Sequence, residues 1–383
     1  MKLADLIDPF QKADGPPPQT LRSFFGWCLS GAWPVLLIAA FFSALAGSLE
    51  VVSAYILGSV VDIAVQAGPE GFFGTHAVLL LACVAFFLVI RPILFGLSAA
   101  SSAILVFPNV FPLAHSRLNR WTLSQPISFF EADFAGRISQ KQMQTARAVT
   151  DVTMEMINVV AFALASIIGT IFLLITIDQR IALVLGVWLI AYIVLLRWFL
   201  PRIRVRSKAR AGARAAVTGQ VVDAVTNVKT VKLFAHDAHE DQAALNSMEI
   251  YRQKGIKFGQ LSAGFRLSLM TLAGFLPVAL IGGVLFLWSQ GNTTPGDVAA
   301  AGTVSVRIAQ MTGWVSFALL AMYGNIGEIE DGMATLTPRP TLVDAPDAQE
   351  LNSVTGAVQF KDVSFQYGRK SGGIRNLNLT LQP

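Results

Sequence analysis

Three ionisable residues lie inside long apolar stretches of the sequence, where a charge is difficult to accommodate. Glu50, Arg91 and Arg307 each interrupt such a stretch. A charge in the hydrocarbon of a membrane costs at least about 2.5 kcal/mol unless it is paired or hydrated. Each of the three therefore needs a partner, which is either another residue of the chain or a bound substrate.

Glu50 and Arg91 are placed to pair with each other. Glu50 lies 16 residues before Gln66, and Arg91 lies 15 residues after His76. An antiparallel hairpin that turns between Gln66 and His76 brings both charges to a similar depth, so we predict a salt bridge between them. The alternative is that one of the two contacts a substrate in a cavity.

Arg307 lies about nine residues into the last apolar stretch and is followed by Gln310 and Thr312. Both a cavity-lining role and an ordinary packing role remain open for it. Arg197 and Arg266 lie near the ends of their stretches, where a long side chain can extend to the interface. For these two we expect no function beyond that.

Other kinds of chemistry find little support in the sequence. No G-x-S-x-G or H-E-x-x-H motif is present, and His236 and His239 are the only closely spaced histidines among four. Cys28 and Cys83 are too few for a disulfide framework or a metal site. The sequence therefore argues against a hydrolase or a metalloenzyme of these kinds.

The composition is that of a membrane protein that crosses the bilayer several times. Hydrophobic residues make up 54% of the 383 residues, charged residues only 14%, and the mean hydropathy is +0.56. A soluble protein usually has about 25% charged residues. Each of the long apolar stretches can span about 30 Å of hydrocarbon as a helix. We predict six spans: Trp33–Val65, Ala77–Leu113, Ile157–Ile177, Ile181–Leu200, Leu267–Trp288 and Val298–Ile326.

The basic residues predict the orientation. The expected outer loops carry one basic residue in total, Arg180, whereas the inner connections between Ser116 and Lys232 are rich in Lys and Arg. The positive-inside rule therefore predicts a multi-pass protein of the cell (inner) membrane with both termini in the cytoplasm. A basic collar at the bilayer surface also explains the net charge of +5 without a nucleic-acid partner.

Two inner connections retain helical periodicity, which predicts that membrane helices extend into the cytoplasm as hairpins. Pro126 and Gly136 would break the first hairpin near its tip. The apolar positions that recur at helix spacing are Val149, Val152, Met156 and Val159 in the first hairpin, and Val222, Val225, Val228 and Val231 in the second.

The last 28 residues, Gly356 to Pro383, predict two β-strands. Apolar side chains alternate from Val358 to Phe365, with a register change near Lys361 and Asp362, and again from Leu377 to Leu381. No G-x-x-x-x-G-K-[ST] sequence, the loop that holds nucleotide phosphates, occurs anywhere in the 383 residues.

Three ordered motifs resemble the exporter type of ABC transporter. They are QPISFFEADFAGRI at residues 125–138, GQVVDAVTNVKTVKLF at residues 219–234, and GEIEDG at residues 327–332, which leads into the first strand. The resemblance implies a mostly α fold with a cytoplasmic lead at 1–24, a six-helix transmembrane domain at 25–335, and a linker at 336–355. Residues 356–383 then resemble the first strands of a nucleotide-binding domain, and we expect the sequence to be truncated before the phosphate-binding loop.

The resemblance also implies roles for particular residues. Tyr367 would stack on adenine. Short helices near Ser139–Ala146 and Val222–Asn227 would dock into nucleotide-binding domains and couple them to the membrane helices, with Gln142, Met143, Val225 and Asn227 as coupling residues. In the same family the sixth span lines the pathway, which is what a cavity-lining role for Arg307 would require.

The function implied by the resemblance is ATP-driven export by a dimer. A second copy or a homologous half-transporter would supply the other six spans, and ATP with Mg²⁺ would drive alternating access. The cargo would be a hydrophobic or amphipathic small molecule, lipid or peptide. The alternatives are a secondary transporter on the same six-span fold without an ATPase, and a regulatory membrane scaffold. The 383-residue chain alone, which lacks the phosphate loop, is expected to hydrolyse no ATP and to bind no cofactor.

Overall fold

A computed structural model describes all residues except 1–5, 132–134, 236, 339–346, 349–355 and 366–372. The chain divides into two units, Met1–Arg339 and Pro340–Pro383. The first is helical and the second contains the two strands, and each is described by itself below.

Among the described residues, six helical stretches are long and apolar enough to cross a membrane, which confirms the predicted number. They cover Trp33–Ala67, Ala77–Leu123, Gly136–Ile177, Gln179–Thr226, Glu240–Ser289 and Pro295–Leu336. The stretch Gln179–Thr226 has 48 residues and is therefore about 72 Å long, more than twice the thickness of the hydrocarbon. The helices thus extend beyond the bilayer, as the periodicity of the inner connections predicts.

Four of the six spans are each a single named helix or nearly so, and the other two are interrupted by π-helical turns. The first, fourth, fifth and sixth spans are α2 (Trp33–Ala67), α10 (Gln179–Thr226), α12 (Asp237–Ser289) and α13 (Pro295–Leu336). The second consists of α4 (Ala77–Ala85), η2 (Phe86–Ile90), α5 (Arg91–Ala100), η3 (Ser101–Val106) and α6 (Phe107–Leu123). The third consists of α8 (Ala135–Glu155), η4 (Met156–Ala161) and α9 (Phe162–Ile177).

Each π-helical turn of the second span ends two residues before a proline. η2 ends one residue before Arg91-Pro92, and η3 ends before Phe107-Pro108. A proline lacks the N–H that would bond to the fourth preceding carbonyl, and a π-turn accommodates that gap without ending the helix. One extra residue per π-turn also rotates the side chains that follow, so the faces of this span depart from simple helical periodicity.

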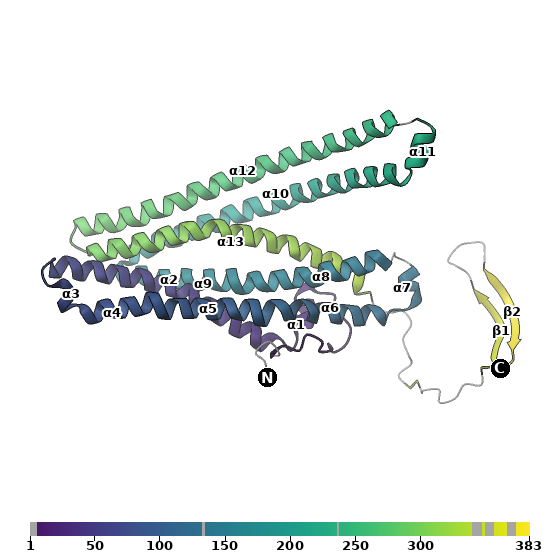
Figure 1. The fold of residues 1–383 in the computed structure, drawn as a ribbon, viewed down its shortest axis with the longest axis horizontal. Helices are drawn as coiled ribbons and strands as arrows, with labels where there is room; N and C mark the ends of the chain where they lie inside the picture. The colour runs from purple at the N-terminus through teal and green to yellow at the C-terminus, as the bar shows by residue number, and fades with distance from the viewer. Residues whose placement is uncertain (1–5, 132–134, 236, 339–346, 349–355, 366–372) are drawn as a thin grey trace. The chain divides into compact units, whose positions relative to one another are not determined.

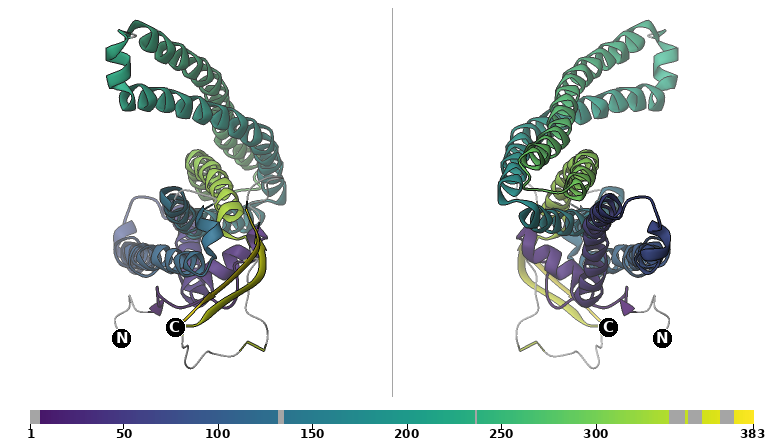
Figure 2. Two further views of the ribbon diagram at one scale, coloured as in Figure 1. Left: turned by 90° about the vertical axis from the view of Figure 1, so that its right-hand side faces the viewer. Right: turned by 90° about the vertical axis from the view of Figure 1, so that its left-hand side faces the viewer.

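The short helices connect the spans at their two ends (Figure 1). α7 (Ile127–Glu131) lies between α6 and α8, and α11 (Val228–Leu233) lies between α10 and α12, both at the same end of the helical unit. α3 (Phe72–Thr75) connects α2 to α4 at the opposite end. Figure 2 shows that the hairpin of α10 and α12 diverges from the other helices toward α11.

Two clusters of buried apolar side chains hold the helical unit together. One lies among α1 (Leu21–Leu29), α2, α6, α8 and the C-terminal part of α13. The other joins α9, α10, α12 and the N-terminal part of α13. Beyond Ile203 of α10 and before Phe265 of α12, none of the described side chains is buried. Beyond the ion pair of Arg204 with Glu330 of α13 at 3.7 Å, the described part of the α10–α12 hairpin is therefore loosely packed toward its tip.

Arg117 of α6 fixes the N-terminal helix α1. Its side chain is 2% exposed and donates hydrogen bonds to the carbonyls of Trp27 at 2.6 Å, Cys28 at 3.0 Å and Ser30 at 2.8 Å. These carbonyls lie at the C-terminal end of α1, where backbone acceptors lack helical partners and favour a cation. Arg117 thus caps α1 from another helix.

The residues before α1 also contact α6. Arg117 Nε donates to the carbonyl of Gln11 at 3.1 Å, Ser116 Oγ donates to that of Pro9 at 3.2 Å, and Ile7 is 2% exposed. The described part of the lead is therefore packed against the helical unit.

The two predicted strands are present as an antiparallel pair, β1 (Val358–Phe365) and β2 (Ile374–Leu381). Phe360 pairs with Leu379 and Val363 with Leu377, so the register shifts between Phe360 and Val363. Asp362 lies in this shift with a φ of 47°, and its N–H donates to Oδ1 of Asn378 at 2.9 Å. The predicted register change near Lys361 and Asp362 is confirmed.

The role of Arg117 can be tested through Cys28, which is fully buried in α1 and whose thiol pKa is raised by that burial. In a Cys83→Ala background, Arg117→Met removes the cap, so we expect α1 to detach and a maleimide to modify Cys28 at least about tenfold faster. Arg22→Gln, which changes an exposed base on α1, is the matched control and should leave the labelling rate unchanged. Equal slow labelling of both variants would contradict this role.

Candidate functional site

Glu50 is buried in the middle of α2 because neighbouring helices approach its backbone closely. Its side chain is 8% exposed. One turn earlier, a Cβ on Gly47 would lie 2.3 Å from the carbonyl oxygen of Phe162, so only glycine allows α2 and α9 to pack at this distance. The carboxylate is thereby removed from solvent and must find its partners within the protein.

Two arginines from two other spans bind the same oxygen of Glu50. Nη2 of Arg91, at the start of α5, donates to Oε1 at 3.0 Å, and Nη2 of Arg307, in α13, donates to Oε1 at 3.0 Å. Arg91 also lies over the ring of Phe95, with its Cζ 5.5 Å from the ring centroid. We call Glu50, Arg91 and Arg307 the charge cluster.

The salt bridge predicted between Glu50 and Arg91 is confirmed, and the pairing of Arg307 with Glu50 was missed. Depth along the helices was the signal that could have found it. Glu50 lies about 25 Å from the end of α2 at Ala67, and Arg307 lies about 18 Å from the start of α13 at Pro295. Arg91 lies about 21 Å from Ala77 along the second span.

The charge cluster is electrically unbalanced. One carboxylate faces two guanidinium groups, and the side chains of Arg91 and Arg307 are 36% and 41% exposed. The Nε atoms of both arginines are buried and have no hydrogen-bond partner. The cluster therefore keeps an excess positive charge and unused donors at membrane depth.

A second polar contact joins α2 and α13 at the end of the unit where α3 lies. Asp62 of α2 accepts hydrogen bonds from Thr294 Oγ1 and from the N–H of Gly296, both at 2.7 Å. A Cβ on Gly296 would lie 2.2 Å from the carbonyl oxygen of Gly58, so the two backbones touch here. Thr294 also forms a capping box with Asp297, the signal in the sequence that marks this helix start.

The predicted positions of the two short coupling helices are wrong. Ser139–Ala146 lies inside the long helix α8, and Val222–Thr226 forms the last turn of α10. The short helices at the tips are instead α7 and α11. The predictions missed them because helical periodicity continues across these segments and does not mark where one helix ends.

The four predicted coupling residues have different surroundings. Gln142 is 6% exposed, on the part of α8 that packs against α13, where Lys141 binds Asp331. Met143 is 54% exposed and Val225 is 66% exposed. Asn227 joins α10 to α11, and its side-chain amide donates to Asp223.

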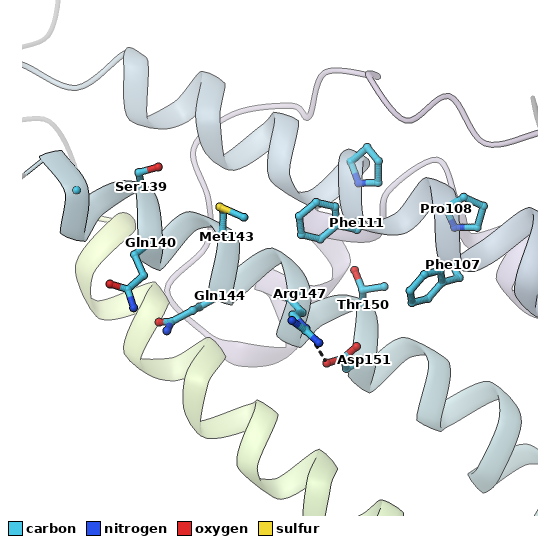
Figure 3. Close-up of a pocket in the computed structure, with 12 residues that line it drawn as sticks. Phe107, Pro108, Phe111, Ser139, Gln140, Met143, Gln144, Arg147, Thr150 and Asp151 are labelled. Atoms are coloured by element: carbon cyan, nitrogen blue, oxygen red, sulfur yellow. Dashed lines mark ion pairs between the residues drawn. The ribbon is translucent and has the colours of Figure 1, made fainter. Parts of the chain in front are cut away.

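Met143 belongs to an open groove between α6 and α8 with a volume of about 790 Å³ (Figure 3). Phe107 and Phe111 of α6 form one wall, and Ser139, Gln140 and Gln144 of α8 line the other side. Arg147 and Asp151 form an ion pair of 3.9 Å along the same helix. The groove thus combines an apolar wall with polar side chains.

Nucleotide and metal chemistry have few candidates in the described part of the chain. Among the described residues no group of three or more His, Cys, Asp or Glu side chains is placed to hold a metal ion. Tyr367, the predicted adenine-stacking residue, lies outside the described residues.

Comparisons with known proteins agree on one family. The family described as ABC transporter transmembrane region matches residues 36–312. A protein of Haemophilus influenzae called an uncharacterized ABC transporter ATP-binding protein is 29% identical over 381 residues, which cover 98% of this chain and 61% of that protein. An ATP-dependent lipid A-core flippase of Methylobacillus flagellatus is 24% identical over 69% of this chain and 44% of its own length.

A solved structure shares the fold. A bacterial Atm1-family ABC exporter with ATP bound superposes with a TM-score of 0.73 at 15% sequence identity, covering 91% of this chain and 61% of the exporter chain. The present chain thus spans about three fifths or less of the length of these relatives.

The stability of the charge cluster should depend on which member is removed. Glu50→Gln leaves two guanidinium groups facing each other, so we expect a loss of about 1.5–3 kcal/mol in the free energy of unfolding. Arg91→Gln and Arg307→Gln each leave Glu50 paired with one arginine, so each should lower the free energy of unfolding by less than Glu50→Gln does. Chemical unfolding in a neutral detergent measures this.

The double variants test whether the three residues act together. Glu50→Gln combined with Arg91→Gln should lose less stability than the sum of the two single changes, because both act on one network. Strictly additive losses would show that the residues act separately.

Proposed function

The chain belongs to the family of ABC transporter transmembrane regions, and we propose that it forms the membrane part of an ATP-driven exporter that works as a dimer of two copies. The observation that carries the dimer is the uncovered hairpin of α10 and α12. Exposed apolar side chains on the part of the hairpin nearer α11 include Val205, Val222, Leu245 and Ile256. Burying such a surface is favourable, and a second copy is the partner we propose.

ATP would bind to nucleotide-binding domains in an assembly that supplies the phosphate-binding loop missing from these residues. The strands β1 and β2 resemble the beginning of such a domain, in which Tyr367 would stack on adenine. Mg²⁺ would accompany the nucleotide. We assign this chain the role of receiving the movement of those domains and passing it to the membrane.

The tips of the two cytoplasmic hairpins are the elements we propose for coupling. In α11, Leu233 is 79% exposed, and Phe234 just after it is 63% exposed; in α7, Ile127 is 77% exposed. Val225 and Asn227 lie at the base of α11, and Met143 faces the groove beside α7. When the nucleotide-binding domains close, force applied at these tips would tilt the long helices and alternate access between the two sides of the membrane.

The cargo we propose is a hydrophobic or amphipathic compound, lipid or peptide that leaves the cytoplasm. The flippase named above acts, by its name, on lipid A-core, and a relative in Rhizobium meliloti, 25% identical over 57% of this chain, is named a β-(1→2)glucan export protein. The first name specifies a lipid and the second specifies export. We place the protein in the cell (inner) membrane with both termini in the cytoplasm.

A secondary transporter on the same six-span fold is the alternative. The strands β1 and β2 weigh against it, because such a protein has no need for the start of a nucleotide-binding domain. A dependence of conformation on ATP, and not on a proton gradient, separates the two.

A spin label at Gln290, an exposed residue of the outer turn between α12 and α13, tests the dimer and its response to ATP. Cys28 and Cys83 would be replaced by alanine first. In a dimer of two copies the two labels are close enough for dipolar coupling, and trapping with ATP and vanadate should lengthen their distance as the outer side opens. The measurement uses the assembly that includes the ATPase domains.

Absence of any dipolar coupling would contradict the dimer of identical copies. A distance that follows a proton gradient and ignores ATP would instead favour the secondary transporter.

Substitution at the tip of α11 tests coupling. Leu233→Asp should leave the affinity for ATP near normal and reduce the stimulation of ATP hydrolysis by cargo or lipid at least about fivefold, because the tip no longer fits an apolar groove. Leu6→Asp changes another exposed leucine, in the N-terminal lead away from the α10–α12 hairpin, and is the matched control. Full stimulation in the Leu233 variant would show that α11 is not a coupling element.

A further inference from the structure

The membrane-spanning part of the chain contains fewer acids than its arginines require. In the six predicted apolar stretches of the sequence, the only acidic residues are Glu50 and Asp62. Asp62 binds Thr294 and Gly296 at the outer end of α13. Glu50 alone therefore balances Arg91 and Arg307, and the charge cluster keeps a formal charge of +1.

A second copy of the chain cannot supply the missing negative charge. The same two acids occur in the apolar stretches of the second copy, and its Glu50 faces its own pair of arginines. Two copies therefore double the excess positive charge. A charge at this depth is costly unless it is paired or hydrated, so an anion that would pair directly with the excess charge has to come from outside the protein.

Arg91 and Arg307 have the free donors that an anion requires. A guanidinium group carries five N–H donors, and each of the two gives one hydrogen bond, to the same oxygen of Glu50. Both side chains are more than a third exposed, and both Nε atoms lack a partner. Two guanidinium groups held side by side are suited to a carboxylate or a phosphate group.

An apolar groove begins beside the charge cluster. Phe95, whose ring lies under Arg91, lines a groove of about 490 Å³ that continues along the second span to Phe107, with Met154 and Asn158 on the facing helix. Arg91, Phe95 and Ser102 follow one another at helical spacing. A charged group and an adjoining apolar groove are the two parts that an amphipathic anion needs.

We propose that the charge cluster binds the carboxylate or phosphate group of an amphipathic cargo, whose hydrocarbon part lies along the groove that begins at Phe95. This inference rests on the proposed function and specifies its cargo as anionic. Glu50 has two effects in this arrangement. It holds the two arginines together, and it offsets part of their charge, which weakens anion binding and allows the cargo to leave.

Trp314 makes the binding measurable. It lies about two turns beyond Arg307 on α13, and its ring centroid is 6.0 Å from that of Phe162, which in turn lies 6.4 Å from Phe95. The probe is 11-bromoundecanoate, whose bromine quenches tryptophan fluorescence, added at pH 8 to the protein in a neutral maltoside detergent. The difference between the wild type and Trp314→Phe isolates the signal of Trp314.

The acid should quench Trp314 at lower concentrations than its uncharged methyl ester, although the ester partitions into a neutral micelle more strongly than the ionised acid. Arg91→Gln and Arg307→Gln should each raise the half-saturating concentration of the acid about tenfold, the effect of one lost charge-assisted hydrogen bond. Arg197→Gln, which removes an exposed arginine of α10, is the matched control and should bind as the wild type does. Glu50→Gln should bind the acid more tightly.

The proposal is overturned if acid and ester quench Trp314 equally in the wild type, or if the Arg91 and Arg307 variants bind the acid as the wild type does. If one arginine variant fails to fold, the other variant and the comparison of acid with ester decide, because unchanged binding or equal quenching contradicts the proposal. Acetate that displaces the probe at equal concentration would indicate a site for a free anion and also contradict it. The measurement needs no nucleotide, so its failure is distinct from failure of the dimer or of ATP-driven export.

Discussion

The arrangement of the membrane helices depends on how the charge of Glu50 is compensated. An ionised carboxylate near the middle of a bilayer has no water to solvate it. The free-energy cost of burying this charge is larger than the stabilisation that most single contacts provide. Arg91 and Arg307 meet this cost by donating to one oxygen of Glu50 from the second and the sixth span. Three helices are thus joined at one point, and their depth and rotation relative to each other are fixed there.

Close backbone contacts extend this point into a rigid group of helices. Gly47 lies against the backbone of α9, and Gly58 and Gly296 bring α2 and α13 into contact, with Asp62 binding the start of α13. The part of the α10–α12 hairpin nearer α11, by contrast, has no buried side chain among its described residues beyond Ile203 and before Phe265. A rigid group of helices and a hairpin whose far part has no buried side chain among its described residues are suited to a protein in which one part moves against another.

The sequence predicted those features that depend on composition, depth and alternation. The six spans follow from apolar length, the Glu50–Arg91 pair from equal distances to a turn, and the register change near Asp362 from the interrupted alternation. Arg307 was not assigned to Glu50, because the sequence does not tell which spans pack together. The ends of α8 and α10 were misplaced, since nothing in the periodicity marks where α7 and α11 begin. The stacking of Tyr367 on adenine stays a prediction.

The most direct test of this account is a measurement of which arginines contact Glu50 in a bilayer. Solid-state NMR with ¹³C-labelled glutamate and ¹⁵N-labelled arginine reports carboxylate-to-guanidinium distances, and the signal lost in Glu50→Gln identifies this carboxylate. The account predicts two guanidinium contacts to Glu50 in phosphatidylcholine bilayers, one lost in Arg91→Gln and the other in Arg307→Gln. A Glu50 carboxylate that contacts only Arg91, or neither arginine, would contradict it.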